Sequence, residues 1–253
     1  MTGGGETGRE VVVRLRTGVP PPARVSPPPR DGRVALVSGG SRGLGLRVVE
    51  RLAGLGMRVV MGSRSPERGR AALDLLGGLA DRVAVRQLDV LDPASVERLT
   101  TWMEERLGRC DVLVSTAATS VPRGWDVTAT DLSAVRAALE TNVRGVRLLT
   151  QAVAPLMRRA RYGRVVTMSS GQDGPAHRVS RRAVSALTRE LADELAPHGI
   201  LVNACCPGST GRVPAGGRGA GHPFESETPV WLATLPDDGP TGSVFCTPAP
   251  RRR

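Results

Sequence analysis

The sequence predicts an α/β fold in one domain: a doubly wound parallel sheet with helices on both faces. From Arg33 onward, apolar runs of strand length alternate with longer segments of helical period, which is the pattern of repeated β-α-β units. The strand-length runs are apolar on both faces, as strands covered by helices on both sides must be. A length of 253 residues suits one domain of this kind.

Six apolar runs are predicted as strands, at residues 34–37, 58–61, 83–88, 111–114, 164–168 and 200–204. Between them, apolar residues at spacings of three and four predict helices, including 93–107, 131–159 and 178–195. Asp92 is the expected N-cap of the first of these, with Pro93 at its first helical position. Residues 209–230 are rich in Gly, Ser and Pro and predict a loop over the carboxyl ends of the strands, where such folds bind ligands.

Residues 1–30 differ in composition from the rest of the chain. They hold three consecutive Gly residues and two runs of three Pro residues, with Arg between them. Such a segment cannot bury enough apolar surface to become ordered. We therefore expect a disordered tail or a mis-assigned start at 1–30, and an ordered domain at 31–253.

The formal net charge is +11, and all 35 basic residues are Arg. These arginines are scattered through helices, loops and tail, and no nucleic-acid motif accompanies them. A general bias toward Arg therefore explains the charge better than a nucleic-acid surface, which stays a distant alternative. The four cysteines have no metal-ligand spacing, so no metal is expected. No apolar run is long enough for a bilayer and no signal core is present, which favours a cytoplasmic protein with no membrane partner.

A glycine-rich turn follows the first predicted strand and precedes a helix. Residues 38–45 read Ser-Gly-Gly-Ser-Arg-Gly-Leu-Gly. Gly39 allows a tight turn, Gly43 allows the backbone to approach a pyrophosphate, and Gly45 allows close packing of the helix on the sheet. The free N–H groups of the helix N-terminus attract the phosphates. This turn predicts a Rossmann-type dinucleotide site that also includes Ser41, Arg42 and Leu44; the alternative is a tight turn without a ligand.

The choice of dinucleotide follows from charge. An acidic residue after the second strand would accept the ribose 2′-hydroxyl of NAD, but residues 62–64 read Gly-Ser-Arg. Arg64 at this point and Arg42 in the glycine turn suit a 2′-phosphate, because guanidinium groups bind phosphate through two hydrogen bonds. The sequence therefore predicts NADP as the cofactor, the alternative being two solvated surface charges.

The G-x-x-x-G-x-G spacing resembles that of the short-chain dehydrogenase/reductase family, and the resemblance extends over residues 33–245. Its closing segments, 228–233 and 237–242, are similar to the carbonyl-reductase-like branch. The resemblance implies adenine contacts, a helix Asn that holds a water, a catalytic Ser and a Pro-Gly turn facing the nicotinamide. In that order, the matching residues are Asp89 with Val90, Asn142, Ser170, and Pro207 with Gly208. Ala117 is a further expected cofactor residue after the fourth strand, where residues 115–118 read Ser-Thr-Ala-Ala in place of the family's Asn-Asn-Ala-Gly.

The resemblance fails at the two residues that reduce the carbonyl. The family uses a Tyr that donates a proton and a Lys four residues later that lowers the Tyr pKa and holds the ribose. Here His177 and Arg181 occupy these positions, and only six residues separate Ser170 from His177. Either His177 acts as the acid of an NADP-dependent reductase of small carbonyl compounds, in which Arg181 holds the ribose, or the protein binds NADP(H) without catalysis. A monomer and a homo-oligomer are equally compatible with the sequence.

Overall fold

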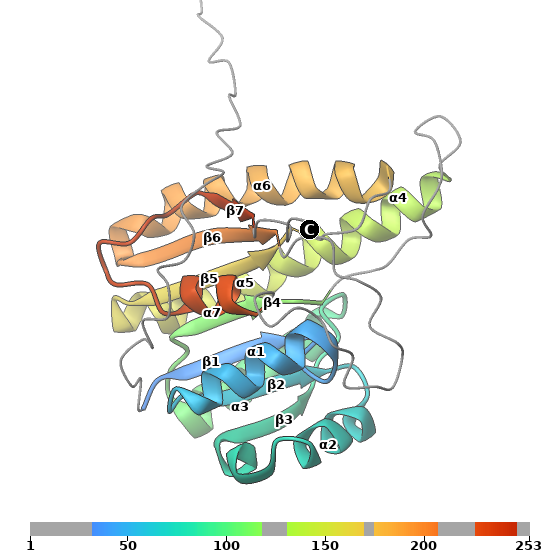
Figure 1. Ribbon diagram of the computed structural model, residues 1–253. Helices are drawn as coiled ribbons and strands as arrows, with labels where there is room; N and C mark the ends of the chain where they lie inside the picture. Colours follow the sequence, from blue (N-terminus) through green and yellow to red (C-terminus); the bar gives the residue numbers. More distant parts are fainter. Residues whose placement is uncertain (1–31, 118–130, 170–174, 207–225, 247–253) are drawn as a thin grey trace, which may run out of the picture.

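A computed structural model describes residues 32–117, 131–169, 175–206 and 226–246, with only the backbone described at 175–178 and at 246. Its centre is a seven-stranded parallel sheet of order β3-β2-β1-β4-β5-β6-β7 (Figure 1). The order reverses direction between β1 and β4, so the predicted doubly wound fold is confirmed. The strands are β1 Val34–Ser38, β2 Arg58–Ser63, β3 Val83–Gln87, β4 Val112–Ser115, β5 Gly163–Met168, β6 Ile200–Cys206 and β7 Val244–Cys246.

All six predicted strands are present, and β7 is an additional strand that the sequence did not predict. It has three residues and pairs with the end of β6, where Val244 lies opposite Ala204. Three residues are too few to show a periodicity. Its position is instead determined by the asparagine on the neighbouring strand: Asn203 accepts a hydrogen bond from the backbone N–H of Ser243 at 3.2 Å and donates one to the carbonyl of Pro240 at 2.7 Å.

The helices connect the strands and form two layers. They are α1 Gly43–Gly54, α2 Pro66–Asp74, α3 Pro93–Leu107, α4 Leu132–Leu139, α5 Gly145–Ala160, α6 Pro175–Leu195 and α7 Glu227–Ala233, with 3₁₀ turns at Gly77–Arg82 and Ala196–His198. The predicted cap of α3 is confirmed, because the side chain of Asp92 accepts a hydrogen bond from the N–H of Ala94 at 3.0 Å. None of the described helices is long and apolar enough to cross a membrane.

Two helix predictions and one loop prediction need correction. The expected helix 131–159 is divided into α4 and α5 by a π-helical turn, Glu140–Arg144. The expected helix 178–195 begins at Pro175, because proline fits the first turn of a helix, where its missing N–H costs nothing. The end of the expected loop 209–230 is helical from Glu227, whereas residues 207–225 lie outside the described part of the chain.

Alternation along β1 shows how the sheet is covered on both faces. Ala35 and Val37 belong to the core that packs against α1, α2 and α7, whereas Val34 and Leu36 belong to the core beneath α3, α5 and α6. All four side chains are essentially inaccessible to solvent. The strands are therefore apolar on both faces because helices cover both faces of the sheet, as the sequence predicted. Since the faces are covered, only the ends of the sheet are open for a binding site.

Candidate functional site

The glycine turn lies between the carboxyl end of β1 and the start of α1. Gly39 and Gly43 have positive φ angles of 69° and 53°, a conformation that favours glycine. A Cβ added at Gly45 would clash with the carbonyl oxygen of Gly39 and lie 2.6 Å from Oγ1 of Thr116. A Cβ added at Gly43 would meet no atom within 4 Å, so this backbone faces open space. The turn thus provides a backbone surface that an elongated anion can approach closely.

Hydrogen bonds join this turn to the ends of the neighbouring strands. Gly40 donates its N–H to the carbonyl of Gly62 on β2 at 3.1 Å. Oγ1 of Thr116, just after β4, donates to the carbonyl of Ser38 at 2.6 Å. Ala117, a predicted cofactor residue, lies beside the turn, since a Cβ at Gly39 would be 3.0 Å from its backbone nitrogen. Residues from three adjacent strands therefore form one rigid edge.

The N-terminus of α1 is unusually free of competing negative charge. Its N-cap is Arg42, whose side chain makes no capping hydrogen bond, and its first turn contains no acidic residue. Leu44 lies in this first turn and is half-buried against the core. The first N–H groups of a helix have no intrahelical acceptors and carry a partial positive charge. This end of α1 can therefore bind a phosphate.

Polar and cationic residues lie at the ends of β1 and β2 beside the turn. The hydroxyl of Ser63 is 3.0 Å from that of Ser41 and 2.8 Å from the carbonyl of Ser65, which connects the two strand ends. Arg42 and Arg64 are the neighbours of these serines in sequence, and both are exposed. Neither arginine forms an ion pair with any carboxylate in the described part of the chain. Both guanidinium groups are accordingly available for an external anion.

Asp89 and Val90 lie just beyond the carboxyl end of β3. Asp89 accepts a hydrogen bond from the N–H of Leu91 at 3.0 Å and donates its own N–H to Ser95 at 3.0 Å, so one carboxylate oxygen already stabilises the turn. Val90 is buried against Gly145, the first residue of α5. The structure thus places both residues at the same end of the sheet as the glycine turn.

The π-helical turn between α4 and α5 carries Asn142. Its side chain is buried, and Nδ2 donates to the hydroxyl of Ser180 on α6 at 3.2 Å. Its Oδ1 is buried and has no hydrogen-bond partner among the described residues. π-Helical turns often occur at functional sites, where they displace a side chain from the regular helical path. The orphaned oxygen is an acceptor that a water or a ligand can satisfy, a feature that the sequence alone did not reveal.

The other predicted catalytic residues lie on α6 or outside the described residues. Arg181 is half-buried on α6 next to Ser180, and His177 lies one helical turn earlier, with only its backbone described. Ser170, Pro207 and Gly208 lie outside the described part of the chain. The structure therefore brings Asn142 and α6 together and leaves the positions of three predicted residues open.

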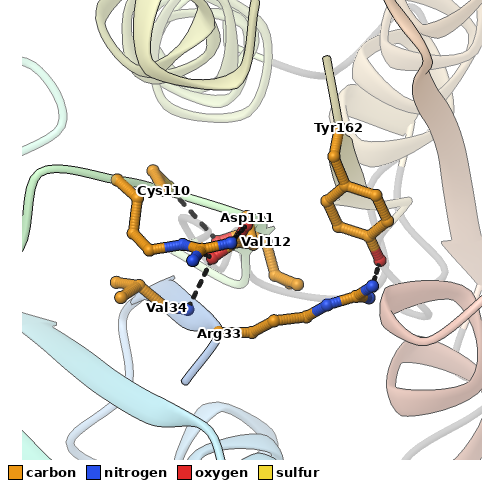
Figure 2. A network of polar contacts seen from close by, with 7 residues as sticks. Arg33, Val34, Cys110, Asp111, Val112 and Tyr162 are labelled. Carbon is orange, nitrogen blue, oxygen red and sulfur yellow. Dashed lines mark hydrogen bonds and ion pairs between the residues drawn. The ribbon is translucent and has the colours of Figure 1, made fainter. Parts of the chain in front are cut away.

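Tyr162, the only tyrosine of the chain, lies at the opposite end of the sheet. It precedes β5, and its hydroxyl accepts a hydrogen bond from Arg33, whose guanidinium lies 3.9 Å from the ring centroid (Figure 2). Beside it, buried Asp111 accepts hydrogen bonds from the N–H of Val34 at 2.7 Å and from Arg109. Because the glycine turn follows the carboxyl ends of the strands, this tyrosine is too far away to replace the missing one.

Two further chemistries find no support in the described residues. No three His, Cys, Asp or Glu side chains come together there as metal ligands would. Cys205, at the end of β6, is completely buried, and this burial raises its pKa far above the usual range. Since the thiolate is the reactive form, Cys205 is an inert core residue at neutral pH.

Residues 33–215 match the family described as short chain dehydrogenase, so the chain belongs to this family of oxidoreductases and the predicted resemblance is confirmed. It is 35% identical to (+)-borneol dehydrogenase 2 of Salvia officinalis, over 70% of this chain and 64% of that protein. It is 32% identical to the 3-oxoacyl-[acyl-carrier-protein] reductase FabG of Escherichia coli (strain K12), over 70% of this chain and 73% of that protein. The crystal structure of a metagenomic short-chain oxidoreductase in complex with NADP superimposes with a TM-score of 0.72 and 26% identity, covering 87% and 99% of the two chains.

Proposed function

We propose that the protein is an NADP-dependent oxidoreductase that reduces the carbonyl group of a small molecule. The observation that carries this proposal is the glycine turn: its backbone is open at Gly43, the first residue of α1, and the exposed Arg42 and Arg64 form no ion pair among the described residues. The NADP in the related metagenomic oxidoreductase supports the choice of cofactor. Families of this fold bind their dinucleotide at this end of the sheet.

Different residues of the turn and of its neighbours would bind different parts of the cofactor. The backbone of Gly39, Ser41, Gly43 and Leu44 would hold the pyrophosphate at the helix N-terminus. Arg42 and Arg64 would bind the 2′-phosphate of the adenosine ribose, since guanidinium groups match the geometry of phosphate. Asp89 and Val90 would contact the adenine, and Pro207 and Gly208 would face the nicotinamide. Ala117, on the same edge of the sheet, would also contact the cofactor.

In this proposal the chemistry takes place between β5 and α6, and bound NADPH supplies the hydride. Ser170 would donate a hydrogen bond to the carbonyl oxygen, and His177 would donate the proton that converts it to a hydroxyl. The orphaned Oδ1 of Asn142 would hold a water that returns a proton to the site. Arg181 would hold the ribose; its guanidinium stays charged and cannot take part in the proton relay.

A second candidate function is NADP(H) binding without catalysis. His177 and Arg181 favour it, because they replace the family's Tyr and Lys. Imidazole is shorter than phenol, and a displacement of about 1 Å can reduce a rate on the order of a hundredfold. The charge of Arg181, one turn away in the same helix, also disfavours the protonated imidazole that must act as the acid.

The cofactor assignment predicts that NADPH binds more tightly than NADH. Arg42→Gln and Arg64→Gln should each weaken NADPH binding by about 1.5–3 kcal/mol, the range for hydrogen bonds to a charged group. Both variants should bind NADH as the wild type does, because NADH lacks the 2′-phosphate. Arg70→Gln, on the exposed surface of α2, is the matched control. Isothermal titration calorimetry that gives equal affinities for the two cofactors would contradict the assignment.

The catalytic assignment predicts weak NADPH oxidation that depends on His177. Free imidazole titrates near pH ~6.5, so the rate should fall as the pH rises and the acid loses its proton. His177→Ala should abolish turnover of a panel of ketones and aldehydes while NADPH still binds. Equal rates for wild type and His177→Ala across the range of roughly pH 5 to 9, where imidazole titrates, would favour the non-catalytic function.

A double variant tests the same site by restoring the family's residues. His177→Tyr with Arg181→Lys should raise the rate if residue identity is the main defect. If the rate stays the same, the short 171–176 segment is the defect, because the acid then lies in the wrong place whatever its identity. NADPH affinity, measured on the same variant, distinguishes a loss of chemistry from a loss of cofactor.

A further inference from the structure

A hollow of about 440 Å³ lies on the α3 face of strands β2 and β3. Its walls are the start of β2, the end of the 3₁₀ turn Gly77–Arg82, most of β3 and the last turns of α3. The proposed cofactor site follows the carboxyl ends of the strands, whereas most of this lining belongs to the amino-terminal halves of β2 and β3. Of the lining residues on these strands, Arg86, which pairs with Gly62, lies nearest to the carboxyl ends. Four arginines and a tryptophan dominate its lining: Arg58, Arg82, Arg86, Arg106 and Trp102. We call it the arginine pocket.

The sheet contributes two of these arginines from one face, and the 3₁₀ turn before β3 contributes a third. Val60 packs in the core beneath α3, and because side chains alternate along a strand, Arg58 faces the same way two residues earlier. On β3, Ala84 and Arg86 likewise border the pocket. Arg82 immediately precedes β3 and is fixed by donating to the carbonyl of Gly56 at 2.9 Å.

Helix α3 closes the pocket from the other side. Trp102 and Arg106 are four residues apart and therefore lie on the same helix face. The guanidinium of Arg86 lies 3.7 Å from the centroid of the Trp102 ring. Strand and helix are thus held together by an arginine stacked on an indole, and Arg106 extends over the same hollow.

The guanidinium of Arg86 uses only some of its hydrogen-bond donors. Nη1 donates to the carbonyl of Val85 at 3.1 Å, whereas the buried Nε has no hydrogen-bond partner among the described residues. Buried donors in native proteins are almost always satisfied by protein, water or ligand. This Nε–H is therefore a donor that a bound ligand or a water can satisfy.

The charges of the arginine pocket are unbalanced. Its lining contains four guanidinium groups and a single carboxylate, Asp81. Arg58, Arg86 and Arg106 form no ion pair with any residue that the structure describes. Guanidinium groups bind phosphate through parallel hydrogen bonds, and a volume of this size lies in the range of small-molecule sites.

We propose that the arginine pocket binds a small phosphate ester or polyphosphate, separately from the cofactor. The phosphate groups would lie among Arg58, Arg86 and Arg106, and the indole of Trp102 would contact the apolar part of an organic ester. A bound anion of two or more charges offsets the mutual repulsion of the arginines. This inference does not depend on the proposed reductase activity.

The test is a calorimetric titration of the full-length protein with inorganic pyrophosphate and with ADP at constant ionic strength. The pocket variant is Arg58→Gln with Arg106→Gln, two exposed residues whose loss spares the core. The charge-matched control is Arg51→Gln with Arg70→Gln on exposed surfaces of α1 and α2. Saturable binding should weaken at least about tenfold in the pocket variant, as expected for lost charged hydrogen bonds, and stay unchanged in the control.

The two ligands and one further variant distinguish the sources of affinity. Tighter binding of ADP than of pyrophosphate, with the difference lost in Trp102→Leu, identifies an organic ester as the ligand; equal binding identifies the phosphate groups alone. An equal loss in both double variants would overturn the proposal, since it shows a general effect of charge. The absence of saturable binding, a loss only in Arg42→Gln, or binding of a single-stranded oligonucleotide without binding of pyrophosphate would overturn it as well.

Discussion

Gly45 and Gly54 lie in the same helix, but only one of them has room for a methyl group. At Gly45 a Cβ would clash with the carbonyl oxygen of Gly39, which holds α1 against the turn. At Gly54 the same atom would meet nothing within 4 Å. At the scale of single residues, the shape of the turn therefore depends on a close approach of two backbone segments.

Gly45→Ala should destabilise the protein by about 1–3 kcal/mol, because the added methyl group forces a shift of the backbone. NADPH binding should fall with it, since the shift displaces the N–H groups at the start of α1. Gly54→Ala, the matched control, should stabilise the protein by up to about 1 kcal/mol through higher helix propensity. Urea denaturation measures both. A Gly45→Ala protein of wild-type stability would show that the turn has space that this structure lacks.

The contact between Asn142 and Ser180 is a second feature at the scale of single residues, in the catalytic half of the site. Their hydrogen bond connects the π-helical turn to α6 and orients the asparagine so that Oδ1 is left for another partner. The sequence predicted Asn142 as a site residue only through its resemblance to a family. Ser180 gave no signal, because its role depends on a residue 38 positions away.

At the scale of elements, Arg164 joins β5 to the segment between α7 and β7. Its side chain is almost completely buried and donates to the carbonyls of Leu235 and Gly163, both at 2.9 Å. It also forms an ion pair with Asp237 at 2.6 Å, and its guanidinium lies 4.1 Å from the Tyr162 ring. A buried charge is tolerated because these groups satisfy it from several directions.

Arg164→Ala should therefore lower the free energy of unfolding by about 3 kcal/mol or more, because two buried carbonyl groups lose their donor at about 1–3 kcal/mol each. Arg159→Ala removes a surface ion pair with Glu104, in which both side chains are more than half exposed, and should cost no more than about 1 kcal/mol. Chemical denaturation of the two variants compares them directly. Equal losses would mean that the Arg164 contacts are compensated elsewhere.

At the scale of the whole molecule, the sheet separates two ends with different chemistry. The carboxyl ends of the strands carry the glycine turn, Asn142 and α6, whereas the amino ends carry the Arg33–Tyr162 contact and most of the lining of the arginine pocket. Arg33 is the first residue with a described contact to this framework. We therefore propose that the domain begins close to this residue.

Deleting residues 1–30 should leave the melting temperature and the NADPH affinity unchanged within error, because their composition gives them too little apolar surface to bury. Arg33→Ala in the shortened chain is the matched comparison. It should lower the melting temperature, since it removes the hydrogen bond and the ring contact with Tyr162. Differential scanning calorimetry distinguishes the two. A clear drop on deletion alone would show that the tail packs on the domain.

The sequence by itself determined the fold class, six of the strands and the location of the glycine turn. Each of these depends on local information: apolar runs on a strand, a spacing of three and four on a helix, glycines between the two. The apolar sequence of β1 sufficed to predict a sheet covered on both faces, and the family resemblance that followed from the turn is confirmed.

Only the tertiary structure decided which distant residues meet. The burial of Arg164, the pairing of Asn142 with Ser180, the short β7 and the gathering of arginines around Trp102 each join residues far apart in the chain. In sequence, Arg58 and Arg86 are two of 35 scattered arginines. Parallel strands and the crossing of α3 bring them to one hollow, because strand pairing fixes their register and helix packing fixes the face they share.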